Sequence, residues 1–485
     1  MAGKAEALRY AVRLRVLVKY LGQLFLIIAL LAAVPAGICL LYREYAAASA
    51  YFSAAGALAA GGWLANRLPG ADRIQTNEAV VMTVTGFVVA SAVAVAPLVL
   101  SGLSPADALF EAVSGITTTG LTMRDVGRPM SPGLQFGRAW LQWSGGLGIV
   151  IFSLVLILPS GAVARDMAET EAIEDDLLGG VKAFARHVLA VYVALTLLGI
   201  VLLAVSGLSP VDAVLYALAA VSTGGFAPHT ASAAALGNWP AQTALMGLAL
   251  AGALPMLLYI RLVRRKPVGA RDAAQLAGLL LLVAAASGTM VLSEGLRDRP
   301  APSPSVYHLA WTAFSAQTTA GFSILPVAEL SPGSKIALIM AMFVGGGMGS
   351  TAGGVKLFRM LAFLHLIRSV VYRTHLSPHA VPSTSFLGGP LDDAESQKLL
   401  LVPLLFTAVV VFSWLLFCIY GYPALDSLFD VVSATGTVGL SAGVADRQLP
   451  VLLKLVLCAD MLLGRLEIFA WLVAVSPNTW IGRRL

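Results

Sequence analysis

The sequence predicts an all-α polytopic membrane protein, and three observations carry that prediction. The 485 residues are 58% hydrophobic and only 12% charged, with a mean hydropathy of +0.83, and a water-soluble chain cannot bury so much apolar surface. Ten apolar runs are long enough to cross about 30 Å of hydrocarbon. Between these runs, four short segments of related sequence recur, and each is too short to cross the membrane.

The ten apolar runs extend over almost the whole chain. The first run follows a long charged segment and has no small-residue cleavage site, so we expect a retained helix and not a signal peptide. The runs lie at residues 22–42, 50–66, 79–101, 137–159, 187–206, 240–262, 273–293, 335–371, 398–420 and 449–475.

Basic residues gather before the first run, after the sixth run and at the C-terminus. The positive-inside rule places such clusters in the cytoplasm, so we expect both termini on the cytoplasmic side. This topology accounts for the net charge of +6 without a nucleic-acid partner. The clusters contain Lys4, Arg9, Arg13, Arg15, Lys19, Arg261, Arg264, Arg265, Lys266, Arg271, Arg483 and Arg484.

The four recurring segments align on one glycine without a gap. They read SPADALFEAVSGITTTGL (104–121), SPVDAVLYALAAVSTGGF (209–226), SVYHLAWTAFSAQTTAGF (305–322) and PALDSLFDVVSATGTVGL (423–440). The two Ser-Pro openings place serine at a helix N-cap and proline at the first helical position. Each segment is therefore predicted to form a helix of about three turns, followed by an extended Thr-x-Gly triplet.

Asp107, Asp212, His308 and Asp426 lie thirteen residues before the four aligned glycines. We interpret these residues as helix caps that stabilise the positive end of the helix dipole, in preference to catalytic groups. The opposite, negative end of each short helix then points toward the centre, where it stabilises a cation. The six histidines are scattered along the chain, which argues against a membrane enzyme.

The Thr-x-Gly triplets have the composition of a carbonyl-lined filter. Irregular backbone is tolerated inside a membrane only where it is buried in protein or lines a water-filled path. Glycine allows the chain to turn successive carbonyl groups the same way, and rings of such carbonyls replace the hydration shell of K⁺ in channels with TVGYG loops. The predicted filter residues are Thr118, Thr119, Gly120, Thr223, Gly224, Gly225, Thr319, Ala320, Gly321, Thr437, Val438 and Gly439.

With these triplets and three further motifs, the chain resembles the TrkH/TrkG/KtrB superfamily of bacterial potassium uptake proteins. The motifs are QWSGGLGI (142–149), GGMGSTAGGVKLFR (346–359) and GRLEIF (464–469), and the similarity covers about residues 79–475. The additional N-terminal helix pair makes the chain more similar to TrkH and TrkG than to KtrB.

The resemblance implies four covalently linked helix, pore-loop, helix repeats around one K⁺ pore, usually in a homodimer in the inner membrane. It also implies regulation by a cytosolic nucleotide-binding ring of TrkA or KtrA type, which must be a separate chain. K⁺ is then the transported ion, lipid surrounds the protein, and no resident cofactor is expected. The corresponding division of the chain is 1–78 (helix pair), 79–160, 161–271, 272–397 and 398–485 (repeats 1 to 4).

A glycine-rich segment interrupts the long run at 335–371. No strand precedes it and Lys356 does not fit a phosphate-binding loop, which argues against a nucleotide site. Flexible backbone in the middle of a membrane helix is a good candidate for a gate. We therefore interpret the segment as a gate on the cytoplasmic side of the filter. The alternative is close helix packing through small residues. The predicted gate residues are Gly346, Gly347, Gly349, Ser350, Thr351, Gly353, Gly354 and Lys356, together with Arg465.

Arg465 breaks the fourfold pattern of small residues. Twenty-six residues after the four filter glycines stand Gly146, Ala251, Gly347 and Arg465, preceded by Gly145, Leu250, Gly346 and Gly464. An ionisable residue inside a spanning helix indicates function, and we expect its charge to oppose cation passage and to hold the glycine-rich segment. The alternative is an ion pair with Asp460 or Glu467.

Three points stay open at this level. The Thr-Thr-Gly and Thr-Gly-Gly triplets depart from Thr-Val-Gly, which leaves a Na⁺-dependent or weakly selective cation pathway as an alternative. Cys39, Cys418 and Cys458 stand singly and predict neither disulfide nor metal site. The acidic stretch 167–176 is interpreted as a solvated loop, with docking to a basic regulator as the alternative.

Overall fold

The computed structural model describes residues 11–69, 74–124, 130–157, 177–297, 304–375, 385–387, 389–390 and 393–481. The acidic stretch 167–176 and the basic residues Lys4, Arg9, Arg483 and Arg484 lie outside the described residues, so the predictions made for them stay predictions.

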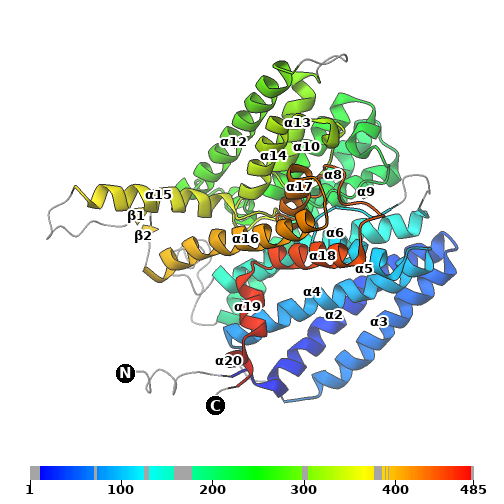
Figure 1. Cartoon of the computed structure of the whole chain (residues 1–485). Coiled ribbons are helices and arrows are strands. Elements are labelled where there is room, and N and C mark those ends of the chain that lie inside the picture. The colour runs from blue at the N-terminus through cyan, green and yellow to red at the C-terminus, as the bar shows by residue number, and fades with distance from the viewer. Residues whose placement is uncertain are drawn as a thin grey trace.

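The described residues are helical apart from a two-residue β-ladder and the connecting loops, which confirms the predicted all-α fold class (Figure 1). The first half contains α2 (Leu14–Leu41), α3 (Tyr45–Asn66), α4 (Thr76–Leu100), α5 (Pro105–Ile116), α6 (Pro132–Ile157), α8 (Leu177–Val205), α9 (Pro210–Val221), η1 (Ser232–Leu236), α10 (Trp239–Ala253) and α11 (Met256–Val263). The second half contains α12 (Ala270–Gly295), α13 (Val306–Gln317), η2 (Val327–Glu329), α14 (Pro332–Val344), α15 (Leu357–Arg373), β1 (Ser385–Phe386), β2 (Gly389–Pro390), α16 (Asp393–Ile419), α17 (Ala424–Thr435), α18 (Val451–Arg465), α19 (Phe469–Val475) and α20 (Pro477–Trp480).

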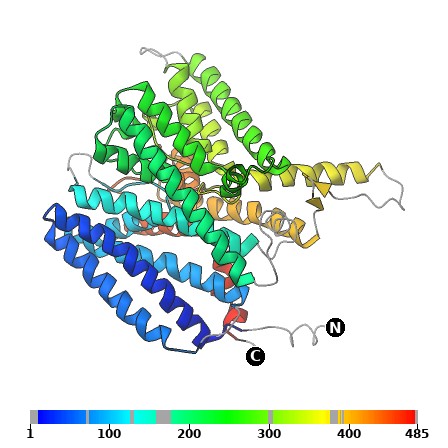
Figure 2. The same cartoon turned by 180° about the vertical axis from the view of Figure 1, so that it is seen from behind.

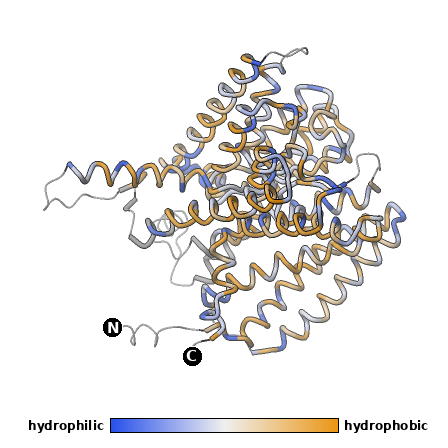
Figure 3. Tube along the Cα trace, in the orientation of Figure 1, coloured by the Kyte–Doolittle hydropathy of each residue, from blue (hydrophilic) through white to orange (hydrophobic). Residues whose placement is uncertain are grey.

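Five helices among the described residues are long and apolar enough to cross a membrane, and a sixth span is added if the bent pair α10 and α11 is counted. The five are α2, α4, α12 and the parts Ala185–Val205 of α8 and Leu399–Ile419 of α16. Apolar residues predominate along these helices (Figure 3). The protein is therefore a multi-pass membrane protein, with α3 and α6 at two further predicted runs.

Three of the ten predicted runs are broken instead of forming one helix. The break in 335–371 lies at the glycine-rich segment, as predicted. The prediction of single helices was wrong for 240–262 and for 449–475. The pair α10 and α11 bends by 94° before Pro255, which has no N–H to continue the helical hydrogen bonds. α18 and α19 are separated at Glu467, whose φ is 53°.

The helices fall into four successive groups of the same order: a long helix, a short helix, a Thr-x-Gly triplet and a second long or broken helix. We call these groups units 1 to 4 (α4–α6, α8–α11, α12–α15 and α16–α19). The second helix of each unit packs against the short helix of the next, in the pairs α6 with α9, α10 with α13, α14 with α17, and α18 with α5. The last pair joins unit 4 to unit 1, so these contacts close a ring.

The N-terminal hairpin of α2 and α3 packs against α4 and α6 at the edge of unit 1 (Figure 1 and Figure 2). The two ends of the described chain meet, because the Val12 N–H donates to the Thr479 carbonyl at 2.9 Å. The short helices occupy the interior. In α9, every residue from Leu215 to Val221 is buried. The ring of units therefore holds four short helices whose C-terminal parts are buried around its centre.

Candidate functional site

The four Thr-x-Gly triplets share one unusual backbone conformation. Each short helix ends two residues before its threonine, so the negative ends of four helices meet at the triplets. The threonine φ values lie between 49° and 55°, and the glycine φ values between 70° and 99°. Positive φ at a β-branched residue is strained and persists only where the surroundings impose it. The residues concerned are Thr118, Gly120, Thr223, Gly225, Thr319, Gly321, Thr437 and Gly439.

The four triplet glycines touch one another in cyclic order. A Cβ placed on Gly225 would lie 2.6 Å from the Ala320 oxygen, and one on Gly120 would overlap the Gly224 oxygen. Likewise, a Cβ on Gly321 would overlap the Val438 oxygen, and one on Gly439 would overlap the Thr119 oxygen. Each glycine thus lies beside the carbonyl oxygen that precedes the glycine of the next unit. Any side chain at these four positions would displace the backbone of its neighbour.

A serine six residues before the glycine fastens three of the triplets. The Ser114 hydroxyl donates to the Leu121 carbonyl at 2.6 Å and accepts from the Gly120 N–H at 3.1 Å. Ser315 donates to Phe322 in the same way, and Ser433 accepts from Gly439. In unit 2 the equivalent residue, six positions before the glycine, is Ala219. These serines were not predicted as site residues, although all three share one position in the gapless alignment.

In units 1 and 4, a buried carboxylate nine residues before the triplet glycine binds the backbone segment that follows the triplet. Glu111 accepts from the Met123 N–H at 2.7 Å and pairs with Arg138 at 2.8 Å. Asp430 accepts from the N–H groups of Ala442, Val444 and Ala445 at 2.6 to 3.0 Å. An acidic residue in the middle of a buried helix is costly without such partners. That cost was the signal that could have identified both residues from the sequence.

The proposed helix caps have a second partner. Ser104, Ser209 and Ser305 are the N-caps, and each accepts from the N–H of the residue predicted to cap. Asp107 pairs with Lys454 of unit 4, and Asp426 pairs with Lys335 of unit 3, both at 2.6 Å. His308 bonds to Ser305, and Asp212 lies 3.3 Å from His229. Two of the acidic residues therefore join neighbouring units, which capping alone does not explain.

The glycine-rich loop, defined as residues 345–356, lies directly against the triplets. The Gly353 N–H donates to the Thr319 hydroxyl at 2.8 Å, and the Gly354 N–H donates to the Gly436 carbonyl at 3.0 Å. A Cβ on Gly353 would overlap the Thr437 hydroxyl. Among the described residues, the Thr118 and Thr437 hydroxyls have no hydrogen-bond partner. The loop thus closes one end of the ring of triplets.

The other edge of the glycine-rich loop is fastened to the break between α10 and α11. The Thr351 hydroxyl donates to the carbonyls of Val221 and Gly252 at 3.0 and 2.8 Å. The Gly347 N–H donates to the Ala253 carbonyl at 2.9 Å, and Gly349 accepts from the Met256 N–H at 3.0 Å. These are ordered backbone and side-chain bonds between units 2 and 3. Plain packing of a helix through small residues is not what the structure has.

The remaining loop residues make contacts within the loop and with its flanks. The Ser350 hydroxyl donates to the Gly347 carbonyl at 2.6 Å, the Leu357 N–H donates to the Gly346 carbonyl at 2.9 Å, and the Lys356 ammonium donates to the Ala352 carbonyl. All eight predicted loop residues therefore lie in one continuous, hydrogen-bonded crossing beneath the triplets.

Arg465 reaches the same loop from unit 4. Its side chain is 3% exposed, and its Nη1 donates to the Thr351 carbonyl at 2.8 Å. Within the described part of the chain, its Nε and Nη2 have no partner. The alternative ion pairs are not formed, because Glu467 accepts from Arg359 at 2.6 Å and Asp460 from Ser413 at 2.7 Å. Arg465 is therefore a buried cation fastened to the glycine-rich loop.

The register predicted for the small residues opposite Arg465 was wrong in units 2 and 3. Thirteen residues after the first residue of α6, α10, α14 and α18 stand Gly145, Gly252, Gly345 and Gly464. A Cβ at Gly145, Gly252 or Gly464 would overlap the carbonyl four residues before the triplet glycine of its own unit. Counting from the triplets fails because the connections to these helices differ in length. The residues that follow these four glycines are Gly146, Ala253, Gly346 and Arg465. This position therefore holds a small residue in units 1 to 3 and an arginine in unit 4.

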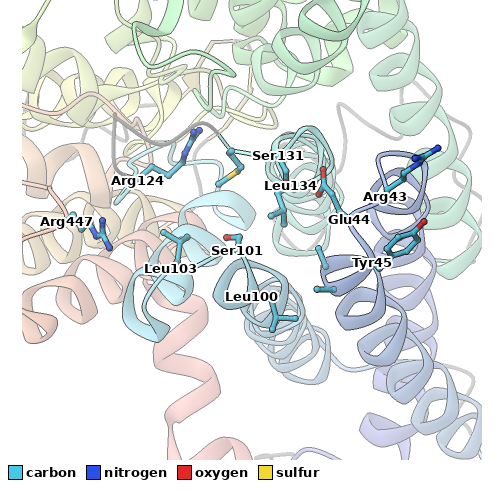
Figure 4. Close-up of a pocket in the computed structure, with 14 residues that line it drawn as sticks. Arg43, Glu44, Tyr45, Leu100, Ser101, Leu103, Arg124, Ser131, Leu134 and Arg447 are labelled. Atoms are coloured by element: carbon cyan, nitrogen blue, oxygen red, sulfur yellow. The ribbon is translucent and has the colours of Figure 1, made fainter.

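A pocket of about 590 Å³ lies beside unit 1, away from the glycine-rich loop (Figure 4). Arg124 and Arg447 line one side of it, and Arg43 and Tyr45 of the N-terminal hairpin line the other. At its wall, Glu44 accepts from the Gly133 N–H at 2.7 Å, close to the start of α6. This contact fastens the hairpin to unit 1 and takes no part in the ring of triplets.

Comparison with known proteins identifies the family. The TrkH family model, described as cation transport protein, matches residues 48–271 and 275–480. The Trk system potassium uptake protein TrkI of Halomonas elongata is 31% identical over 480 residues, which cover 96% of each chain. TrkG of Escherichia coli is 26% identical over 438 residues, covering 87% of this chain and 88% of TrkG.

A solved structure has the same fold. The crystal structure of the potassium transporter TrkH from Vibrio parahaemolyticus matches with a TM-score of 0.83 at 23% identity, covering 97% of this chain and 100% of the other. The similar proteins are transporters and not enzymes, in agreement with the prediction. The chain therefore belongs to the TrkH family of cation transport proteins.

Proposed function

We propose that this protein takes up K⁺ across the bacterial inner membrane through a K⁺-selective filter built from the four Thr-x-Gly triplets. The observation that carries the proposal is the cyclic order of the four glycines, each beside a carbonyl oxygen of the next unit. Rings of backbone carbonyls replace the hydration shell of K⁺ in potassium channels. The names of the relatives, which are Trk system potassium uptake proteins, support K⁺ as the ion.

The transport is channel-like, because the filter supplies binding sites and no covalent chemistry. Four helices direct their negative ends at the triplets, which favours a cation over an anion. The hydroxyls of Thr118 and Thr437, which have no hydrogen-bond partner among the described residues, add two oxygens to the filter, and that of Thr437 lies beside Gly353 of the glycine-rich loop. K⁺ is the cargo and no resident cofactor takes part.

The glycine-rich loop and Arg465 form the gate. The loop lies across the end of the triplets, where Gly353 and Gly354 bond to Thr319 and Gly436. Arg465 adds a positive charge with two unpartnered nitrogens, and a buried charge repels a passing cation strongly. Opening therefore requires the loop to leave Arg465 and the filter threonines.

A cytosolic nucleotide-binding ring of TrkA or KtrA type, on a separate chain, regulates this gate, and the transporter acts as a homodimer. The relatives are named as potassium uptake proteins of a Trk system, and the ring and the homodimer are carried over from the family resemblance. Both termini face the cytoplasm, where the ring would bind. The contact between Val12 and Thr479 supports a common side for the two ends.

A second candidate function is Na⁺-dependent or weakly selective transport of monovalent cations. The observation in its favour is the departure of three triplets from Thr-Val-Gly, since units 1, 2 and 3 have Thr119, Gly224 and Ala320 at the central position. A filter with four different strands can hold an ion less uniformly than a symmetric one.

Cation flux into proteoliposomes that contain the purified protein distinguishes the two functions. K⁺, Rb⁺ and Na⁺ are compared at equal gradients, with and without Na⁺ present. K⁺ and Rb⁺ uptake well above Na⁺ uptake supports the selective filter. Equal uptake of all three ions would refute it, and K⁺ uptake only in the presence of Na⁺ would support the second candidate.

A further inference from the structure

The central position of the triplet is occupied differently in unit 2. The four central residues are Thr119, Gly224, Ala320 and Val438. Gly224 has no positive φ, so its backbone conformation is one that other residues adopt. A Cβ on Gly224 would nevertheless lie 2.5 to 2.9 Å from three side-chain atoms of Gln142. The side chain that the other units carry at this position is therefore replaced by a glutamine from another unit.

Gln142 is hydrogen-bonded to the backbone of the unit 2 triplet on both sides. Its Nε2 donates to the Gly224 carbonyl, and its Oε1 accepts from the Phe226 N–H at 3.1 Å. The side chain is fully buried. One turn earlier on α6, Arg138 lies over the Phe226 ring with 3.8 Å between the guanidinium and the ring centroid. α6 of unit 1 thus holds the unit 2 filter strand.

Unit 2 needs this support because it lacks the serine of the other three units. Ala219 stands where Ser114, Ser315 and Ser433 bond across their own triplets. A strand held in a strained conformation returns to an ordinary one when its restraints are removed. Gln142 supplies from outside the restraint that Ala219 cannot supply from within.

We propose that Gln142 is a positioning residue that determines the ion selectivity of the unit 2 filter strand. The proposal rests on the function proposed above, because it assumes that the Gly224 carbonyl belongs to the ion-binding ring. The Gln142 amide donates to the Gly224 carbonyl. This bond fixes the direction of the carbonyl group and reduces the partial negative charge that its oxygen can offer to an ion. The strand with the least typical triplet is thereby made equivalent to its neighbours.

The first test replaces Gln142 by alanine and by leucine, which has about the same volume but no amide. Both variants should lose about tenfold in the ratio of K⁺ to Na⁺ uptake, as expected when a buried polar group loses its partner. The K⁺ concentration for half-maximal flux should rise, while the amount of folded protein is unchanged. The matched control is Gln135→Leu on the same helix, whose amide donates only to the Met130 carbonyl at 3.1 Å, and its ratio should equal that of the wild type.

The second test is a double-mutant cycle between Gln142 and Gly224. Gly224→Val alone should lower selectivity because the new side chain overlaps Gln142. Combined with Gln142→Ala, the valine enters the vacated space and gives unit 2 the Thr-Val-Gly triplet of unit 4. Compared with Gly224→Val, the double variant should recover the part of the loss that comes from the overlap, but not the part that comes from the missing amide hydrogen bonds. A purely structural role for Gln142 would change yield and stability together and would show no such recovery of an ion ratio.

The outcomes separate the inference from the proposed function. If the wild type does not distinguish K⁺ from Na⁺, the proposed function fails before any variant is compared. If the wild type is selective and both Gln142 variants, recovered as folded protein, keep its ratio, the inference is overturned. A folded Gly224→Val variant that keeps the wild-type ratio also overturns it, because the two side chains would then not share one space.

Discussion

The guanidinium of Arg465 and the backbone carbonyl of Thr351 are joined by a hydrogen bond of 2.8 Å. The bond connects the end of α18 in unit 4 to the glycine-rich loop of unit 3, and Thr351 is bonded in turn to Val221 and Gly252 of unit 2. Three units therefore meet at one residue beneath the filter. A conformational change in any of them alters the position of the loop, which is the property that a gate requires.

Arg465→Ala should increase K⁺ flux. The variant removes both the charge and the bond to Thr351, and each 1.4 kcal/mol by which the barrier falls raises the rate about tenfold. The ratio of K⁺ to Na⁺ uptake should change little, because the triplets are untouched. Flux and ion ratio are measured in proteoliposomes at equal protein density.

Arg261→Ala is the matched control for Arg465→Ala. Arg261 is also buried, but it pairs with Asp272 in the first turn of α12 at 3.0 Å. If a folded Arg465→Ala protein transports no faster than this control, the charge is structural and the barrier lies elsewhere.

Shortening the glycine-rich loop by removing residues 346–353 should raise basal flux, because the segment that lies across the filter is lost. The milder change Thr351→Val keeps the backbone and removes the hydroxyl bonds to the carbonyls of Val221 and Gly252 and to the Thr223 hydroxyl. It should raise flux less than the deletion does. Ser350→Ala is the control, since that hydroxyl bonds only within the loop, to Gly347 and to the Ala352 N–H. Unchanged flux in a folded deletion variant would make the loop a packing element.

The sequence was sufficient for the fold class and for the four triplets, because both depend on local pattern. Apolar runs identify spans, and the gapless alignment identifies residues that share one backbone conformation, as the φ values of Thr118 and Thr437 illustrate. The break at Pro255 was missed because the apolar run continues through it. The bond between Gln142 and Gly224 joins residues 82 positions apart, and no periodicity within one unit predicts a contact between two units.

Register beyond the triplets was the least predictable part of the site. The α10 N-cap, Asn238, lies farther from its triplet than the α14 N-cap, Ser331, does. A count from the triplet therefore selected Leu250 where the structure has Gly252. Glycines that touch a carbonyl of the short helix, such as Gly145 and Gly464, would have given the correct register.

Lys454→Met should destabilise the protein, because it leaves Asp107 buried without its cation. Lys454 and Asp107 are 5% and 3% exposed and lie 2.6 Å apart, and removal of one partner of such a pair costs about 3–5 kcal/mol. The double variant Lys454→Met with Asp107→Asn should recover part of this loss. The midpoint of thermal unfolding in detergent measures both effects. Equal midpoints for the wild type and the Lys454→Met variant would show that the ring of units does not depend on this contact.

Gly→Ser at Gly120, Gly225, Gly321 or Gly439 should lower K⁺ over Na⁺ selectivity or K⁺ affinity without preventing membrane insertion. Each of these glycines has a φ between 70° and 99°, and a Cβ at each would overlap the backbone of the next unit. The substitution therefore combines backbone strain with displacement of a neighbouring carbonyl. Gly102→Ser separates the two causes, because Gly102 has a φ of 97° but nothing within 4 Å of its Cβ position. This control should keep the wild-type ion ratio, whereas unchanged selectivity in all four triplet variants would refute the filter.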